Sequence, residues 1–410
     1  MNNALEVFRH RDYSLLWVIL ITSGMGSWLR ILGTAQWLLD QTNSAWLVGA
    51  IGLVQLIVQT PALLWGGTLA DRIDRKKLIA ASHITSFAVL AALAGLELTD
   101  QLTPGWVYLG IALTAMSQVV ASPARSALIP IIMPERLLLP AASIDTASMN
   151  AGAIIGPLIF AGVAATIGLD AVFLLGGILF LLAALPALLL TVEGYAQSDD
   201  EAGAGKAAES TWAQTREGIR YTARHPILPG LFLLDIGITV VSFYRDILPV
   251  LALGLFAGGA AVSGMLGAAN SVGAVVGSFA AMLFVAYRAK GMLVLYASLA
   301  YAVFLLGFGL SSSLWIGLLM IALVGGADAV TVAVRHTTVM LTTPDDMRGR
   351  AFSLMHLAAA SANNLGTLWI GFFAGLLGAQ GALLLGAVLA MVATCAIGYL
   401  WQPIRTFRSN

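Results

Sequence analysis

The chain has 410 residues, of which 59% are hydrophobic and only 10% are charged, and its mean hydropathy is +0.88. Soluble domains carry about a quarter charged residues, so this composition excludes a soluble protein and indicates an integral membrane protein. The formal net charge is zero and points to no particular partner. Cys395 is the single cysteine, which excludes an intrachain disulfide and a cysteine-based metal site.

Apolar stretches about as long as a bilayer is thick recur along the chain. The first lacks the short apolar core and the cleavage pattern of a signal peptide, so we interpret it as a retained helix. Twelve spans are predicted, at residues 13–39, 46–70, 77–96, 106–128, 141–166, 170–192, 228–255, 259–287, 291–311, 314–337, 350–376 and 380–401.

Lysine and arginine are confined to one set of connections between these spans. Both termini and the even-numbered connections carry them, whereas the odd-numbered connections carry none. By the positive-inside rule, both termini are expected in the cytoplasm. A missed or surplus span would destroy this one-sidedness, which supports the number twelve.

The long polar stretch between the sixth and seventh spans begins as a flexible acidic linker. It continues into a segment in which Thr211 and Gln214 resemble a capping box. We expect a short helix at the membrane surface there, with a solvated linker helix as the alternative. The predicted domains are an N-terminal six-helix bundle (1–192), a cytoplasmic linker (193–227) and a C-terminal six-helix bundle (228–410).

The two halves of the chain match each other. At an offset of 210, "ARSALIPIIMPERLL" aligns with "VRHTTVMLTTPDDMR", so that Arg125 falls on Arg335. Nearer the start of each half, "SWLRIL" matches "SFYRDI", so that Arg30 falls on Arg245. Internal repeats of this kind are frequent in transporters. The predicted fold is therefore all-α, with twelve transmembrane helices in two pseudo-symmetric six-helix bundles.

Several motifs resemble the major facilitator superfamily. "GTLADRIDRK" matches the loop between its second and third helices, with Asp74 in place of the usual glycine, and "GAIIGPLIFAG" resembles its fifth-helix antiporter motif. "FRHRDYSLLW", "SPARSALIP", "REGIRYTARHP" and "TPDDMRGR" are similar to the branch of enterobactin-type siderophore exporters and macrolide-efflux proteins. The resemblance covers essentially the whole chain and implies an exporter driven by the proton-motive force.

The resemblance assigns two groups of residues to conformational change. The loop motif, which latches the two bundles in one state in the superfamily, is represented by Gly67, Asp71, Arg72, Arg75 and Lys76. Its basic residues also serve as simple topology determinants. The fifth-helix motif, which allows close helix approach and bending, retains Gly152, Gly156 and Pro157. The fourth span, "LGIALTAMSQVV", lacks the charged motif often tied to proton coupling, so the resemblance names no coupling residue.

The first, seventh and tenth spans, which line the central cavity in the superfamily, hold a group of charged residues inside the membrane: Arg30, Asp235, Arg245, Asp246, Asp328 and, near the end of its span, Arg335. We expect Arg30 and Arg245 to bind substrate, because guanidinium groups pair with catecholate, carboxylate or phosphate oxygens. Further substrate-binding candidates are Trp28, Tyr244, Gln55, Gln118, Asn270 and Asn363. The proton-coupling candidates, chosen because a buried carboxyl group can hold a proton near neutral pH, are Asp235, Asp246 and Asp328. The alternative is fixed ion pairs, Arg245 with a nearby carboxylate and Arg30 with Asp328.

These features predict a proton-coupled antiporter in the cell inner membrane that exports a small amphipathic molecule, such as a siderophore or a drug, by alternating access. Expected partners are that substrate, protons or another coupling ion, and membrane lipids, without nucleic acid, and we expect a monomer. A lipid or lysolipid facilitator of the same fold is the alternative, and a membrane-embedded enzyme is the alternative from a different class. The sequence has no nucleotide-binding GxxxxGK[ST] loop and neither HExxH nor GxSxG, so we expect no enzyme, no cofactor and no metal.

Overall fold

The computed structural model describes residues 6–191, 216–284 and 287–408, apart from the side chains of residues 64–72 and 345–346. Every regular element in this part of the chain is a helix, which confirms the all-α prediction. Eleven of the described helical segments are long and apolar enough to cross a membrane.

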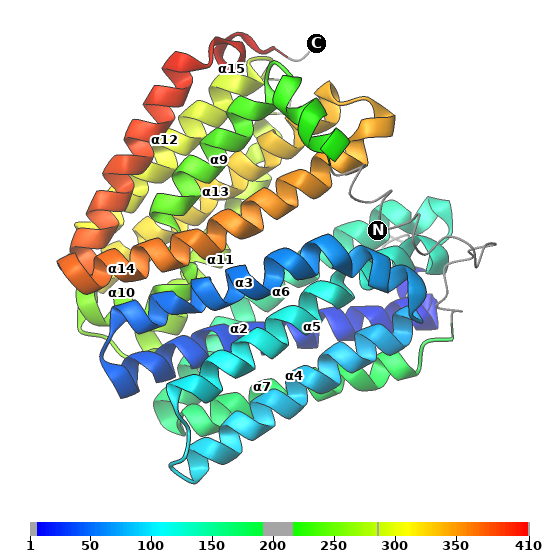
Figure 1. Ribbon diagram of the computed structural model, residues 1–410, viewed down its shortest axis with the longest axis vertical. Helices are drawn as coiled ribbons and strands as arrows, with labels where there is room; N and C mark the ends of the chain where they lie inside the picture. Colours follow the sequence, from blue (N-terminus) through cyan, green and yellow to red (C-terminus); the bar gives the residue numbers. More distant parts are fainter. Residues whose placement is uncertain (1–5, 192–215, 285–286, 409–410) are drawn as a thin grey trace. The chain divides into compact units, whose positions relative to one another are not determined.

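The described residues of the first half, 6–191, form one short 3-10 helix and six long helices, drawn from blue to green in Figure 1. They are η1 (Val7–Arg9), α2 (Arg11–Thr42), α3 (Ala45–Arg72), α4 (Arg75–Leu98), α5 (Pro104–Ile132), α6 (Glu135–Thr166) and α7 (Leu169–Leu188).

The second half continues from green to red in Figure 1. Its elements are α9 (Leu228–Ser242), η2 (Arg245–Ile247), α10 (Leu248–Phe256), α11 (Ala260–Leu283), α12 (Lys290–Gly309), α13 (Leu314–Thr342), α14 (Asp345–Leu400) and α15 (Gln402–Thr406).

Helix α14 holds two of the predicted spans. Its apolar part, Met347–Leu400, has 54 residues and would measure about 80 Å if it were straight, against about 30 Å for the hydrocarbon core of a bilayer. Gly378 interrupts it with a φ of 74°, a value that glycine adopts without strain. In Figure 1 the orange and red parts of α14 run in different directions. Counting these parts separately gives the twelve predicted spans.

The seventh span is broken, whereas the sequence predicted a continuous helix over 228–255. Helix α9 ends at Ser242, Phe243 is extended, and α10 begins only at Leu248 after the turn η2. Pro249, whose ring favours the first turn of a helix, explains why α10 starts there. Irregular backbone at membrane depth is tolerated where it lines a cavity, so the break suggests a functional position.

The chain divides into two compact units. The first comprises Met1–Asn43, Val54–Glu201 and Gly259–Ala268, and the second comprises Ser44–Leu53, Ala202–Gly258 and Ala269–Asn410. These units do not coincide with a division at the linker, because short stretches of α3 and α11 group with the opposite half. The predicted domain boundaries therefore stay a prediction.

In the first unit, the motif "FRHRDYSLLW" joins the start of α2 to two other helices. Thr191, which lies just beyond α7, donates two hydrogen bonds to the Asp12 carboxylate. Its backbone N–H donates at 3.1 Å and its hydroxyl at 2.6 Å. The Tyr13 hydroxyl donates to the carbonyl of Ala141 on α6 at 2.9 Å. The motif is thus a packing element at one end of this unit.

In the second unit, the motif "REGIRYTARHP" packs on the motif "TPDDMRGR". Residues 216–224 are helical, in the region where a short helix was predicted. Glu217 forms an ion pair with Arg350 at 2.7 Å, and the Tyr221 hydroxyl donates to the Thr342 carbonyl at 3.4 Å. The predicted capping box of this segment lies outside the described residues, and its place at the membrane surface stays a prediction.

Candidate functional site

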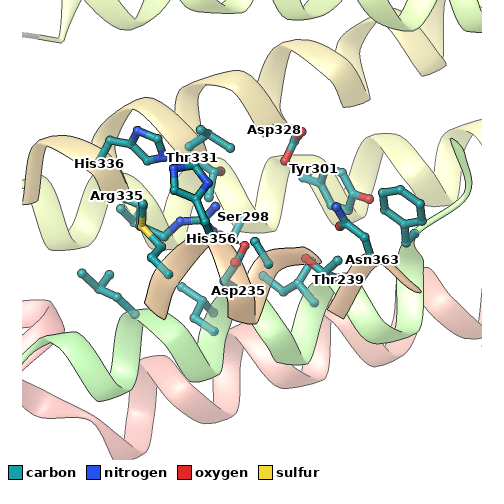
Figure 2. A pocket seen from close by; sticks show the side chains of 18 of the residues that line it. Asp235, Thr239, Ser298, Tyr301, Asp328, Thr331, Arg335, His336, His356 and Asn363 are labelled. Atoms are coloured by element: carbon teal, nitrogen blue, oxygen red, sulfur yellow. Dashed lines mark ion pairs between the residues drawn. The ribbon is translucent and has the colours of Figure 1, made fainter. Parts of the chain in front are cut away.

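The second unit contains a cavity of about 320 Å³ lined by α9, α12, α13 and α14 and by the break after α9 (Figure 2). The ionisable side chains that line it, besides two tyrosines, are Asp235, Arg245, Asp328, Arg335, His336 and His356. Asp328 and Arg335 are two helical turns apart on α13, so they share one face of that helix. A cavity with charges of both signs therefore lies among helices long enough to cross a membrane.

An ion pair joins two of these helices. The Arg335 guanidinium on α13 contacts the Asp235 carboxylate on α9, and the side chains are only 7% and 15% exposed. Both groups are largely removed from water, so loss of either partner would leave a buried charge and cost about 3–5 kcal/mol. The sequence identified Arg335 as the repeat counterpart of Arg125 and as a charge near the end of the tenth span, but it did not predict the pairing with Asp235.

Two histidines lie beside this ion pair. The rings of His336 on α13 and His356 on α14 pack edge to face, with their centres 5.9 Å apart. The His336 ring also packs edge to face on Phe352, with a distance of 5.6 Å between the ring centres. The sequence did not select these histidines, because a lone histidine is more often a structural polar group. The direct succession of Arg335 and His336 was the signal that could have drawn attention to them.

The break after α9 contributes predicted substrate-binding residues to the cavity wall. The Arg245 guanidinium lies 5.8 Å from the centre of the Phe243 ring, and both residues line the cavity together with Tyr244 and Asn363. The Tyr244 hydroxyl accepts a 2.6 Å hydrogen bond from the Asn270 side chain, which places Asn270 behind Tyr244 rather than in the cavity wall.

Asp246 differs from the other two proton-coupling candidates. Asp235 and Asp328 line the cavity, whereas Asp246 does not. Its carboxylate is buried and accepts a 3.1 Å hydrogen bond from the Thr367 hydroxyl on α14. We therefore interpret Asp246 as a group that fixes the broken segment on α14.

The remaining substrate-binding candidates belong to the first unit. Arg30 and Gln55 are buried, and Trp28 and Gln118 are half-buried. Their part in binding stays a prediction.

Arg125, also in the first unit, lies close enough to Asp145 on α6 for an electrostatic interaction, and Asp145 accepts a 3.0 Å hydrogen bond from the Tyr13 hydroxyl. The repeated arginines Arg125 and Arg335 thus each lie near a carboxylate. The two carboxylates, Asp145 on α6 and Asp235 on α9, are on helices that do not correspond in the repeat.

The predicted latch is described only in part. The side chains of Gly67, Asp71 and Arg72 lie outside the described residues, and Arg75 and Lys76 begin α4. Asp74, which replaces the superfamily's glycine, caps this helix, because its carboxylate accepts a 3.1 Å hydrogen bond from the Lys76 backbone N–H. The departure from the motif therefore has a local structural reason.

The fifth-helix motif lies where α6 crosses α2. A Cβ atom on Gly156 would come within 2.7 Å of the Trp28 Cβ, whereas a Cβ on Gly152 would have its nearest neighbour at 3.8 Å. Gly156 is thus the point of closest approach.

Among the described residues, no cluster of three histidine, cysteine or acidic side chains is suited to a metal ion.

A known protein family matches the chain over nearly its full length, and named relatives match four fifths of it or more. The family described as "Transmembrane secretion effector" matches residues 2–409. The chain is 26% identical over 336 residues to the enterobactin exporter EntS of Shigella boydii serotype 4, covering 80% of this chain and 77% of the relative. It is 24% identical over 352 residues to EntS of Citrobacter koseri, covering 86% and 81%.

Solved transporter structures share the fold. A bacterial homologue of the human lysosomal transporter Spinster, inward-facing and occupied, superposes with a TM-score of 0.72 at 17% identity, covering 98% of this chain and 99% of that one. The nucleoside transporter NupG superposes with a TM-score of 0.72 at 16% identity, covering 98% and 100%. At such identities these likenesses show the fold alone.

Proposed function

We propose that this chain, which belongs to the transmembrane secretion effector family of the major facilitator superfamily, is a proton-coupled exporter of a small amphipathic molecule. The family and the relatives are transporters rather than enzymes, and the chain is a multi-pass membrane transporter. The relatives are named enterobactin exporters, which supports export and a siderophore-like cargo. The apolar helices and the exporter relatives support an inner-membrane location, and the one-sided distribution of lysine and arginine supports both termini in the cytoplasm.

The observation that carries the proposal is the Asp235–Arg335 ion pair in the cavity wall. A proton on Asp235 would neutralise the carboxylate and weaken its hold on Arg335. Proton binding and the state of the cavity are then linked, because a ligand that binds better to one protonation state shifts the equilibrium toward that state. Asp328, on the same face of α13, is the second candidate carrier.

Purified protein in sealed vesicles with an imposed pH gradient tests the proposal. Catecholate chelators and cationic drugs are loaded in turn, and their movement is compared between the wild type and Asp235→Asn. We expect gradient-driven movement of one class in the wild type and loss of gradient dependence in Asp235→Asn. Ser278→Ala is the control, because its hydroxyl is exposed and donates only to the Ala274 carbonyl of its own helix. Equal transport with and without the gradient would contradict proton coupling.

A second candidate function is a lipid or lysolipid facilitator. A separate groove of about 670 Å³ lies on α11, α12 and α13, and its lining is almost entirely apolar, including Val276, Phe304 and Val330. An acyl chain fits this chemistry better than a charged chelator does. Movement of a fluorescent lysolipid without a pH gradient, blocked by filling the groove with Ala300→Phe, would favour this function over the exporter.

A further inference from the structure

We infer that Arg335 and Ser298 form a subsite for the anionic oxygens of the cargo, a carboxylate or a catecholate. This inference rests on the proposed transport function and specifies its substrate class. It assigns the binding of the anion to Arg335 on α13 and Ser298 on α12. The sequence had predicted Arg30 and Arg245 for this role.

Arg335 has hydrogen-bonding capacity that the described part of the chain does not use. The residue is 5% exposed and lines the cavity, and its Nη1 contacts Asp235. Its Nε is buried and has no hydrogen-bond partner among the described residues. The guanidinium is a planar fork of five donors, and the edge formed by Nε and Nη2 matches two oxygens of a planar anion. Asp235 thus occupies one side of the fork and leaves a donor free on the other.

Ser298 provides an independent observation at the same end of the cavity (Figure 2). Its side chain is almost fully buried, and its hydroxyl also lacks a hydrogen-bond partner within the described part of the chain. A buried polar group without a partner costs about 1–3 kcal/mol. Two such groups lining one cavity are explained if a ligand oxygen satisfies both.

The surroundings favour an anion on an aromatic or apolar frame. Asp235, the acidic group in contact with Arg335, is already paired with it, whereas His336 and His356 offer ring N–H groups and aromatic faces. Arg245 and Asp328 also line the cavity and offset each other in charge. At about 320 Å³ the cavity lies at the lower end of ligand pockets, roughly 300–1,000 Å³, so it suits one aromatic acid group.

Thermal stabilisation of the purified protein in detergent tests the subsite with two probes, 1-naphthoate and its neutral analogue 1-naphthamide. We expect naphthoate to raise the midpoint of unfolding at lower concentration than naphthamide does. Ser298→Ala should weaken naphthoate binding about fivefold and leave naphthamide unchanged, as expected for one lost hydrogen bond. Asp235→Asn, whose amide oxygen can still accept a hydrogen bond from Arg335, should retain the preference for the acid.

Arg335→Gln alone leaves Asp235 unpaired and can prevent folding. The charge-matched double variant Arg335→Gln/Asp235→Asn avoids this problem and should bind both probes equally. Equal stabilisation of the wild type by both probes, or an acid preference that survives in the double variant, would overturn the subsite. The assay needs no gradient, so a protein that prefers the acid but moves no protons would refute the proposed coupling and leave the subsite standing.

Discussion

The Asn270 side chain on α11 donates a 2.6 Å hydrogen bond to the Tyr244 hydroxyl in the break after α9. Both residues are buried, with 4% and 6% exposure. The same amide also donates to the Ile321 carbonyl on α13 at 3.3 Å. One side chain therefore connects the irregular part of the seventh span to two regular helices, and this connection holds the wall of the cavity in place.

Tyr244→Phe removes the acceptor of the Asn270 amide and leaves the ring in position. We expect a loss of about 1–2 kcal/mol in the free energy of unfolding, since a buried donor loses one partner. Denaturant titration in detergent measures the change. The matched test is Asn270→Leu, in whose background Tyr244→Phe should have little further effect. Full additivity of the two substitutions would show that the hydrogen bond does not couple them.

Two glycines of α6, one turn apart, should respond differently to the same substitution. Gly156→Ala places a Cβ within 2.7 Å of the Trp28 Cβ, so α2 must shift, and we expect a loss of about 1–3 kcal/mol. Gly152→Ala meets only ordinary contacts at 3.8 Å and should be neutral or stabilising by about 0.5–1 kcal/mol, because alanine favours helix. Unfolding midpoints measure both. An equal effect of the two would contradict the crossing at Gly156.

His225, which precedes the seventh span, should make the stability of the protein depend on pH. Its Nδ1 accepts hydrogen bonds from the backbone N–H groups of Ile227 and Leu228, both at 3.2 Å, and it can do so only without a proton on that nitrogen. Burial lowers the pKa of His225 below its usual value of 6.5, against a weaker opposite effect of a hydrogen bond with the Thr342 backbone.

The unfolded chain therefore binds this proton more readily than the folded one. The stabilisation by His225 should be complete above pH 6.5 and should decrease as the pH falls from 6.5 through the lowered pKa. Unfolding measured from pH 5 to 8 tests this, with His225→Asn as the control, since asparagine keeps an acceptor but does not titrate. Identical pH profiles of the two proteins would contradict the assignment.

Asp74 should act as a helix cap. Asp74→Ala is expected to cost about 0.5–2 kcal/mol, whereas Asp74→Gly, which restores the superfamily's usual residue, should cost only a few tenths. The order of the unfolding midpoints checks this prediction. A larger loss for glycine than for alanine would show that capping is not its role.

The sequence predicted much of the fold because hydrophobic length, charge asymmetry and the internal repeat are all encoded locally. It also placed Asp235, Arg245 and Asp328 in the spans expected to line a cavity, and these residues do line one. The repeat was informative as well, because it singled out Arg335 through its match with Arg125. Depth in the membrane follows from position along a span, so these predictions needed no knowledge of packing.

Contacts between helices were not predictable in the same way. The pairing of Arg335 with Asp235 and the meeting of His336 with His356 depend on how α9, α13 and α14 rotate about their axes, which hydrophobicity does not specify when a span is apolar all round. The break near Phe243 was also missed. Pro249 accounts for the start of α10 after this break, because its ring favours the first turn of a helix.

Proton movement in sealed vesicles on addition of cargo tests the central claim most directly. With a pH-sensitive dye inside and no imposed gradient, an exported aromatic acid added to one side should drive protons the opposite way in the wild type. Asp235→Asn should abolish the pH change and retain cargo exchange between the two sides. Cargo-driven proton movement that persists at full size in Asp235→Asn, or cargo transport by the wild type without any pH change, would contradict coupling through the Asp235–Arg335 pair.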